Sequence, residues 1–501
     1  MNTFNRKSLY AALAGLGALS GMGAAEAVNL APEGLGQVLI YPYYTVRNGV
    51  AGFAYNTLLS VVNTTASSKA VKVRFLEGKN SKEVLDFNLF LSKADVWTAV
   101  IKATPNGAGV ASDDASCILP AQLPSTSALV PQPFVNFLYS SDKTIQSDGT
   151  TTPGDTSLDR TREGYVEILE MATFPDNSTT AILITHGSTQ DCGSLDDGQA
   201  STDARRGPGP QGGLFGGLTL INVFDGSAYS QDATALDHVF DNGPVYNNAG
   251  DISPTLADVD PPISVVIANG EAVITDWKTS PRPVDAVSAV LMHNQVLNEY
   301  VTEPSTQSYT DWVVTMPTKN KYVANGTGGA IPPFQSNFNG TKGSCDSITL
   351  EFWDREEKKN TTPGGFSPPQ VTPGTSICWE ANVIIFKAQP LVTPPTGVLG
   401  STNSNFLDVN GKGFVNGWAR LTFVYSNAKL IGGNTTTVGL VNGLGTIGSH
   451  TSATYAGLPV VGFAVVSYNN NVLSIGTKNV QSAYGADFAH RVNTSISFPA
   501  P

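Results

Sequence analysis

Residues 58–78 read LLSVVNTTASSKAVKVRFLEG, and this stretch decides the fold class. Two runs of alternating apolar residues flank a polar turn at residues 63–68. Within residues 71–75 the apolar side chains alternate with Lys72 and Arg74, and this period of two indicates strands with one buried face. The stretch therefore predicts a β-hairpin. Its core face would be formed by Leu59, Val61, Val71, Val73 and Phe75.

The same alternation continues on both sides of this stretch. Residues 85–91 (LDFNLFL) and 95–101 (DVWTAVI) follow it, and residues 38–46 (VLIYPYYTV) precede it. Proline cannot donate to a strand ladder, so Pro42 places the preceding strand at a sheet edge or at a bulge. Short polar turns join these runs. We therefore predict an all-β protein built from antiparallel Ig-like β-sandwiches.

Two long segments interrupt the strand pattern. Residues 140–162 and 187–214 are rich in Gly, Asp, Ser, Thr and Pro, which is typical of long loops. Helices are predicted to be few, at most one or two short ones. The best candidate is residues 284–297 (VDAVSAVLMHNQVL), with Asp285 as a candidate N-cap.

The length of the chain favours more than one domain. Residues 28–320 are predicted to form an N-terminal β-sandwich region with long loop insertions. Residues 321–501 are predicted to form a C-terminal β-rich region. Two arrangements stay open, because the strands of the second region could form their own unit or interleave with those of the first.

The first residues predict export from the cytoplasm. Arg6 and Lys7 precede an apolar segment rich in Ala, Gly and Leu, and the tripeptide Ala25-Glu26-Ala27 follows it. This order is typical of a secretory signal peptide, here residues 1–27. The predicted destination is the periplasm, the cell surface or the extracellular space. No later apolar run approaches the roughly 20 residues of a spanning helix, so no transmembrane segment is predicted in the mature chain.

Charge and cysteine content narrow the class further. The formal net charge of −12 disfavours nucleic acid as a partner, since an acidic surface repels phosphate backbones. The chain has four cysteines, and outside the cytoplasm an even number predicts disulfides rather than a metal site. The simplest pairing joins Cys117 to Cys192 and Cys345 to Cys378, although the count allows three connectivities.

No catalytic residue is predicted. The sequence contains neither the G-x-S-x-G motif of serine hydrolases nor the H-E-x-x-H motif of zinc hydrolases. The five histidines are scattered, and only His238, which follows Asp237, has an adjacent carboxylate. Glu167 and Glu170 are an odd number of residues apart, so on one strand they would face opposite sides.

Aspartates in the two long loops form a weak calcium signal. Ca²⁺ prefers clustered oxygen ligands in Gly-containing loops, although the spaced EF-hand pattern is missing here. The candidate ligands are Asp142, Asp148, Asp155, Asp196 and Asp197. No other cofactor is predicted. The six tryptophans alternate with apolar residues in strand-like runs, which favours core packing over sugar stacking.

Several segments resemble an uncharacterised family of secreted proteobacterial proteins. They include IYPYYTV, LLSVVNTT, AVKVRFLEG, TDWVVTMPTK and YGADFAHR, and they lie in the same order along most of the chain. The resemblance implies secretion and an all-β fold. It implies no activity, because no function is known for that family.

These observations favour an exported structural or interaction protein of the cell surface or extracellular matrix, without catalytic activity. Self-assembly or binding to surface and matrix partners would proceed by strand addition at an exposed sheet edge. The strand that contains Pro42 is one candidate edge, and residues 28–36 (VNLAPEGLG) are a candidate donor tail. The alternatives are a Ca-dependent or carbohydrate-binding lectin-like module and a secreted hydrolase.

Overall fold

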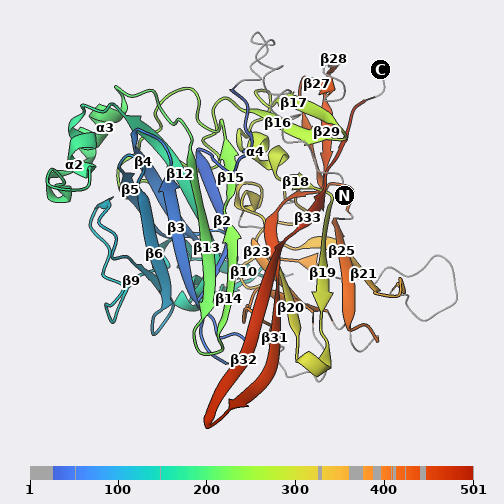
Figure 1. Ribbon diagram of the computed structural model, residues 1–501. Coiled ribbons are helices and arrows are strands. Elements are labelled where there is room, and N and C mark those ends of the chain that lie inside the picture. Colours follow the sequence, from blue (N-terminus) through green and yellow to red (C-terminus); the bar gives the residue numbers. More distant parts are fainter. Residues whose placement is uncertain are drawn as a thin grey trace.

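The computed structural model describes residues 26–50, 52–146, 148–324, 330–359, 376–386, 397–407, 409, 413–423, 425–439 and 447–499. It is mostly β, with 48% strand and 9% helix. Figure 1 shows the many strands arranged side by side in several sheets, with helices α2 (Thr179–Ile184) and α3 (Asp197–Ala204) at one end and α4 (Val284–Val290) among the strands. The predicted signal peptide lies, up to residue 25, outside the described residues.

Two sheets contain all the long strands of the first 237 residues. The seven-stranded sheet has the order β1-β15-β2-β12-β4-β5-β8, and the six-stranded sheet has the order β14-β13-β3-β6-β7-β9. Their bounds are β1 Asn29–Leu30, β2 Val38–Thr45, β3 Asn56–Asn63, β4 Ser68–Glu77, β5 Glu83–Leu91, β6 Val96–Ala103, β7 Ala108–Ala111, β8 Cys117–Leu119, β9 Gln132–Pro133, β12 Glu163–Phe174, β13 Leu214–Asn222, β14 Ser227–Asp232 and β15 Thr234–Asp237. The two sheets bury one shared core, in which Val73 and Ile168 of the first sheet and Val61 and Trp97 of the second take part.

The predicted hairpin at residues 58–78 is wrong in its pairing and right in its core face, although Lys72 and Arg74 on the opposite face of β4 are buried as well. Strand β3 pairs with β13 and β6, whereas β4 pairs with β12 and β5, so the turn at residues 63–68 carries the chain from one sheet to the other. The Asn63 amide holds this arch, because its Nδ2 donates to Ser67 O and Ser92 O, both at 2.8 Å. Alternation reveals which side chains are buried, but an arch and a hairpin share the same alternation.

The C-terminal part forms further sheets. The larger ones have the orders β16-β17-β27-β28, β22-β21-β25-β19-β33 and β24-β23-β20-β31-β32, and the smaller ones β18-β30 and β26-β29-β34; the two-stranded sheet β10-β11 belongs to the first long loop segment instead. Their bounds are β10 Lys143–Ile145, β11 Thr151–Pro153, β16 Ile263–Ala268, β17 Glu271–Asp276, β18 Met292–His293, β19 Gln295–Val301, β20 Tyr309–Thr315, β21 Asp346–Asp354, β22 Ser376–Ile377, β23 Ala381–Phe386, β24 Ser404–Leu407, β25 Asn416–Phe423, β26 Lys429–Gly432, β27 Thr435–Gly439, β28 Ile447–His450, β29 Ala453–Ala456, β30 Leu458–Pro459, β31 Val461–Ile475, β32 Lys478–Ala489, β33 Arg491–Asn493 and β34 Ser495–Ser497.

The predicted antiparallel, mostly β character is confirmed, whereas an Ig-like topology is not. Strand partners change between residues 237 and 263, since β16 pairs with β17, and strands β17 to β20 pair with strands that follow residue 346. The division into two regions at residue 320 stays a prediction.

The described helices outnumber the prediction of one or two. They are α2 (Thr179–Ile184), α3 (Asp197–Ala204) and α4 (Val284–Val290). Helix α3 lies within a predicted loop, whereas α2 replaces a strand predicted at residues 181–188 (AILITHGS). Helix α4 ends at Val290, because the following residues pair as strands β18 and β19. Asp285 is not its N-cap, since Pro283 occupies that position and the Asp285 carboxylate accepts from Tyr322 OH at 2.6 Å.

Pro42 lies at a bulge in an interior strand, so the predicted sheet edge at this strand is wrong. Strand β2 runs between β15 and β12, and the register between β2 and β12 shifts at this position. The freed Pro42 carbonyl accepts from Thr315 Oγ1 at 2.6 Å. The predicted donor tail is also engaged within the chain, because β1 pairs with β15 and Val28 forms a bridge with Ser264.

Two buried glutamates join the N-terminal sandwich to the C-terminal sheets. Glu163 of β12 accepts from Arg47 Nε at 2.6 Å, and from Ser401 Oγ at 2.5 Å and Thr402 Oγ1 at 2.7 Å. Glu380, just before β23, accepts from Ser81 Oγ in the turn between β4 and β5. Both side chains are buried, so the two parts of the chain meet through polar contacts that water cannot replace.

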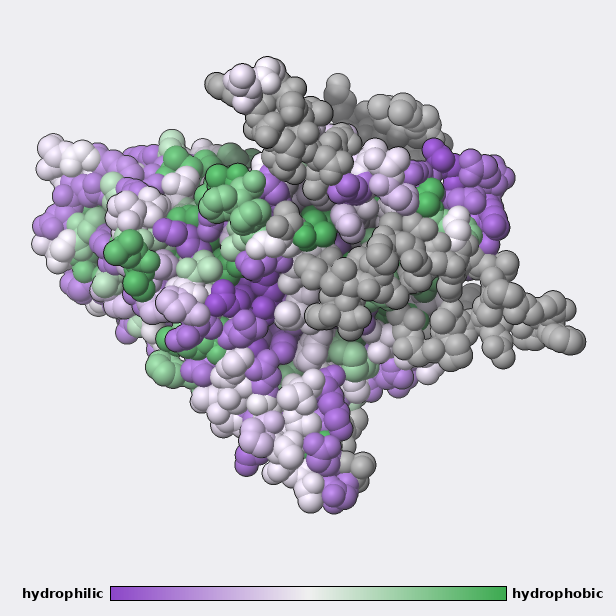
Figure 2. All heavy atoms as spheres, turned by 90° about the horizontal axis from the view of Figure 1, so that it is seen from below, coloured by the Kyte–Doolittle hydropathy of each residue, from purple (hydrophilic) through white to green (hydrophobic). Residues whose placement is uncertain are grey.

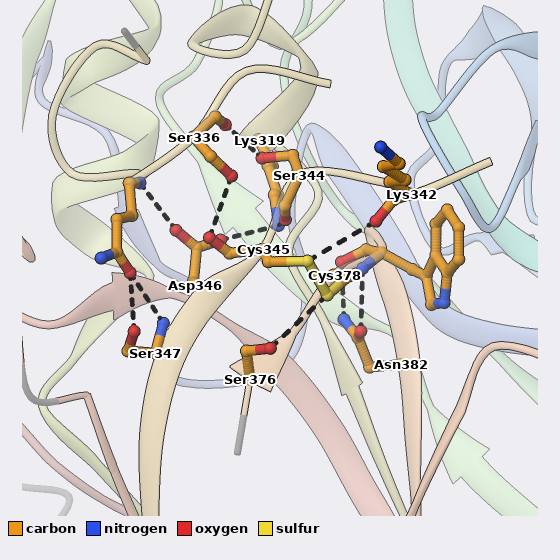
Figure 3. Close-up of a disulfide and its surroundings, with 12 residues drawn as sticks. Lys319, Ser336, Lys342, Ser344, Cys345, Asp346, Ser347, Ser376, Cys378 and Asn382 are labelled. Atoms are coloured by element: carbon orange, nitrogen blue, oxygen red, sulfur yellow. Dashed lines mark hydrogen bonds and ion pairs between the residues drawn. A yellow bond between two sulfur atoms is a disulfide. The ribbon is translucent and has the colours of Figure 1, made fainter. Parts of the chain in front are cut away.

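Both predicted disulfides are confirmed. Cys117 is bonded to Cys192, and Cys345 to Cys378. Figure 3 shows the second disulfide beside Lys319 and Asp346, whose buried ion pair spans 2.7 Å. The first links β8 to the segment before α3, which anchors the loop-rich region to the seven-stranded sheet.

We expect Glu163→Gln to destabilise the protein at neutral pH by on the order of 3 kcal/mol, because it breaks a buried ion pair. Burial alone would raise the pKa of Glu163, but Arg47 and the hydroxyls of Ser401 and Thr402 outweigh it and hold the pKa below its usual value. The stabilisation is therefore present above the unfolded pKa of about 4.3 and is lost as pH falls through the lower folded value. Urea unfolding from neutral to acidic pH measures this. A difference from wild type that stays constant through the acidic range would contradict it.

The contribution of Glu380 to the pH dependence of stability should have the opposite sign to that of Glu163. Burial raises the pKa of Glu380 to about 8. The unfolded chain releases this carboxyl proton at a lower pH than the folded protein does. The folded protein therefore loses stability as pH rises from the unfolded pKa of about 4.3 towards the folded value. We expect Glu380→Gln to flatten this decline between mildly acidic and mildly alkaline pH. Melting temperatures compared with wild type and with the exposed control Glu356→Gln measure it, and equal slopes for all three proteins would argue against it.

Candidate interaction surface

The five candidate calcium ligands are distributed over several elements. Asp142 forms a 2.9 Å ion pair with Arg160, and Asp155 forms a 2.6 Å ion pair with Lys79. Asp148 lies in the turn between β10 and β11, where it accepts from the backbone N and Oγ1 of Thr150.

The remaining two belong to helix α3. Asp196 caps its N-terminus by accepting from Gln199 N at 2.9 Å, and Asp197 accepts from Tyr246 OH at 2.7 Å. Within the described ranges, no group of three His, Cys, Asp or Glu side chains could hold a metal ion. The structure thus gives each of the five carboxylates a donor from the protein.

The other titratable residues singled out in the sequence have structural partners. His238 Nδ1 lies 2.7 Å from Asp241, not from the adjacent Asp237, and this hydrogen bond is the main cause that raises the pKa of His238. Glu167 pairs with Arg74 and Glu170 with Lys69, each at 2.6 Å. Because different cations hold them, the two glutamates do not form a carboxylate pair.

The β31–β32 hairpin projects from the body of the molecule (Figure 1). Strand β31 has 15 residues, but it pairs with β20 only from Val461 to Ser467. From Tyr468 to the turn it pairs with β32 alone, up to Ile475, with a shift of register between Asn469 and Val472. Figure 1 shows this hairpin extending below all other elements. Between residues 469 and 483, no third strand pairs with either edge within the part of the chain that the structure describes.

Exposed apolar side chains lie at the end of the sandwich next to this hairpin. Val223 and Phe224, in the turn between β13 and β14, are 71% and 73% exposed. The ring of Phe53 stacks on Phe224 at 5.0 Å, and Asn222 Nδ2 fixes the loop by donating to Phe53 O. Strand β14 runs beside β32, because Asp487 Oδ1 accepts from Ser230 N at 3.1 Å. Figure 2, seen from below, shows hydrophobic patches on this side of the molecule.

We name Phe53, Val223, Phe224 and the hairpin between residues 468 and 484 the lower-end surface. Sequence reasoning missed it, since residues 460–468 (VVGFAVVSY) and 471–476 (NVLSIG) were interpreted as two separate strands. The available signal was length, because strand-like residues continue with few interruptions from residue 461 to 475. That run is longer than a typical strand of roughly 3–10 residues.

Comparison of the chain with family models, with curated proteins and with solved structures finds no match. In the described residues, no helix is long and apolar enough to cross a membrane. The lower-end surface is therefore interpreted from its own geometry.

We expect about 1 mM Ca²⁺, the range in which extracellular calcium modules bind, to leave the melting temperature unchanged. Asp142 and Asp155 are neutralised by Arg160 and Lys79, and Asp196 is occupied at a helix cap. Differential scanning calorimetry with Ca²⁺ or with a chelator measures this. A rise in melting temperature that Asp197→Asn abolishes would restore the calcium-binding alternative.

Proposed function

We propose that this chain is an exported interaction protein of the cell surface or extracellular matrix, without catalytic activity, that assembles with copies of itself through the lower-end surface. The observation that carries the proposal is the hairpin, which leaves the body as a two-stranded ribbon with two edges that no third strand among the described residues covers. The sequence resemblance to secreted proteobacterial proteins agrees with this assignment and stays a prediction.

Strand edges and apolar patches both favour association. Unpaired N–H and C=O groups along an edge are a template for pairing with another chain. A two-stranded ribbon is only marginally stable by itself, so a third strand would stabilise it. The neighbouring Phe53, Val223 and Phe224 would supply apolar area to the same contact.

A second copy fits this surface for a geometric reason. Antiparallel pairing of one edge with the same edge of another molecule obeys a two-fold axis. The N–H and C=O groups of each copy then pair with the C=O and N–H groups of the other. The strand order supports this, because β32 is the terminal strand of its sheet. Beyond Gly485 its edge is occupied, since Asn298 Nδ2 donates to Phe488 O at 3.2 Å. Pairing is therefore confined to the projecting half of the ribbon.

Shortening the ribbon tests the proposal. Asn469 is in register with Ala483, so residues 470–482 can be replaced by a two-residue Asn-Gly turn that closes the same pair. We expect this variant to keep the melting temperature of the body and to lose self-association. Light scattering after size exclusion and negative-stain microscopy of the wild type and the variant measure this.

Two point variants sharpen the experiment. Phe224→Ser should weaken association, whereas Ile431→Ser, which removes another exposed apolar side chain from strand β26, should leave it unchanged. A wild-type protein that stays monomeric over the full accessible concentration range would contradict the proposal. Equal association of the shortened variant would contradict it as well.

A further inference from the structure

A second surface lies on the outer face of the sheet β22-β21-β25-β19-β33. The inner face of this sheet is apolar and joins the large core through Phe352, Ala419, Leu421 and Tyr300. The outer face consists of side chains that alternate with these. Cross-strand register arranges them in rows, and the first row is Trp353, Trp418 and Glu299.

The two indoles of this row form a preorganised platform. Their rings stack at 4.1 Å with an interplanar angle of 6°. Arg420 and Lys359 each lie 5.2 Å from the ring of Trp353, and both cations pair with Glu351. Trp353 is thus held between Trp418 and these cations, while Trp418 remains 38% exposed.

Trp418 forms one wall of an open pocket of about 460 Å³. Leu297, Asn298 and Glu299 of β19 line it, and Phe488 of β32, which is 44% exposed, lines it from the hairpin side. The Asn298 amide is fixed, since its Nδ2 donates to backbone carbonyls of β32 and its Oδ1 accepts from Glu299 N at 2.9 Å. Aromatic surface and a few oriented polar groups are the composition of a ligand pocket.

Three charged side chains line this pocket, and the Asp487 carboxylate is already bonded to Ser230 and Gln231 of β14. Glu299 and Arg491 both line it and are exposed, and neither side chain forms an ion pair or hydrogen bond within the described residues. A ligand with many neutral groups that both donate and accept can satisfy a carboxylate and a guanidinium together. A polyanion would be repelled by the net charge of −12, whereas a simple cation would leave the Arg491 guanidinium without a partner.

We propose that this pocket, with the Trp353–Trp418 platform beside it, binds a neutral hexose unit of a glycan. The C–H-rich face of a pyranose ring packs on an aromatic ring, whose π face is electron-rich. Trp418 offers such a face to the pocket, with Phe488 as a second apolar contact. The hydroxyl groups then bond to Glu299, Arg491 and the free lone pair of Asn298 Oδ1.

The neighbouring rows extend the site to a chain of sugars. The second row is Glu351, Arg420, Leu297 and Arg491, and the third is Thr349, Thr422, Gln295 and Asn493. Apart from Leu297 these side chains are polar and planar or hydroxylated, so the face can accept hydroxyl groups beyond the pocket. The ligand class is therefore a neutral oligosaccharide or polysaccharide rather than a single hexose.

Saturation-transfer NMR tests the proposal with the full mature protein. The probes are neutral oligosaccharides of glucose, galactose, mannose and N-acetylglucosamine, each added separately, and choline chloride as a non-sugar cation. We expect saturation transfer to sugar ring protons from at least one probe. Trp418→Ala should lower its affinity about tenfold or more, since the stacking contact is lost. Glu299→Gln, a change at an exposed side chain that leaves the fold intact, should lower it several-fold.

Phe224→Ser separates this proposal from the assembly proposal. It should keep sugar binding while weakening self-association, whereas Trp418→Ala should do the reverse. No transfer to any sugar from the wild-type protein would overturn the carbohydrate assignment, and so would binding that both Trp418→Ala and Glu299→Gln leave unchanged. Binding of choline alone would also overturn it.

Discussion

The carboxylate of Glu163 determines how the two halves of the chain meet. Five donors converge on it: Tyr43 OH, Arg47 Nε, Ser401 Oγ, Thr402 N and Thr402 Oγ1. The first two belong to the N-terminal sandwich, and the others directly precede β24, which pairs with β23. From there the pairing continues through β20 to β31, so the direction of the projecting hairpin depends on this buried contact.

Other buried ion pairs have a comparable role inside each half. Arg160 lies between Glu77 and Asp142, and Lys319 contacts Asp346, all of them buried. Such pairs add little net stability, because desolvation offsets most of their attraction, but breaking one leaves a buried charge without a partner. Their effect is to exclude other arrangements of the sheets. A chain with 14% charged residues thus uses several of its charges to fix how its sheets join.

Sequence patterns predicted faces well and partners poorly. The alternation in residues 71–75 identified the buried side of β4, but pairing depends on residues far along the chain, such as those of β12. A helix was predicted for residues 284–297, but it ends at Val290. Beyond it, Met292 and His293 pair with Pro459 and Leu458 as strands. The disulfides were predictable, because four cysteines allow few pairings.

The same period of two, applied to the strands that contain Trp353 and Trp418, predicts the aromatic face. Trp353 is in phase with Glu351 and Thr349, whereas Phe352 is in phase with Ile348, which is buried. Trp418 is likewise in phase with Arg420. Tryptophan in the polar phase of a strand therefore indicates an outward-facing ring. The opposite expectation, core packing, holds for Trp97, Trp277 and Trp312, which are buried.

The two proposed surfaces share strand β32 without sharing side chains. Its distal half, up to residue 483, forms the ribbon, while Phe488 lines the aromatic pocket. Asp487, which also lines the pocket, fixes the strand, because its carboxylate accepts from Ser230 N and Gln231 Nε2 on β14. This anchor connects β32 to the N-terminal sandwich at the point where the ribbon leaves the body. The ribbon begins beyond this anchor. We therefore expect a ligand in the pocket and a second copy on the ribbon to bind independently.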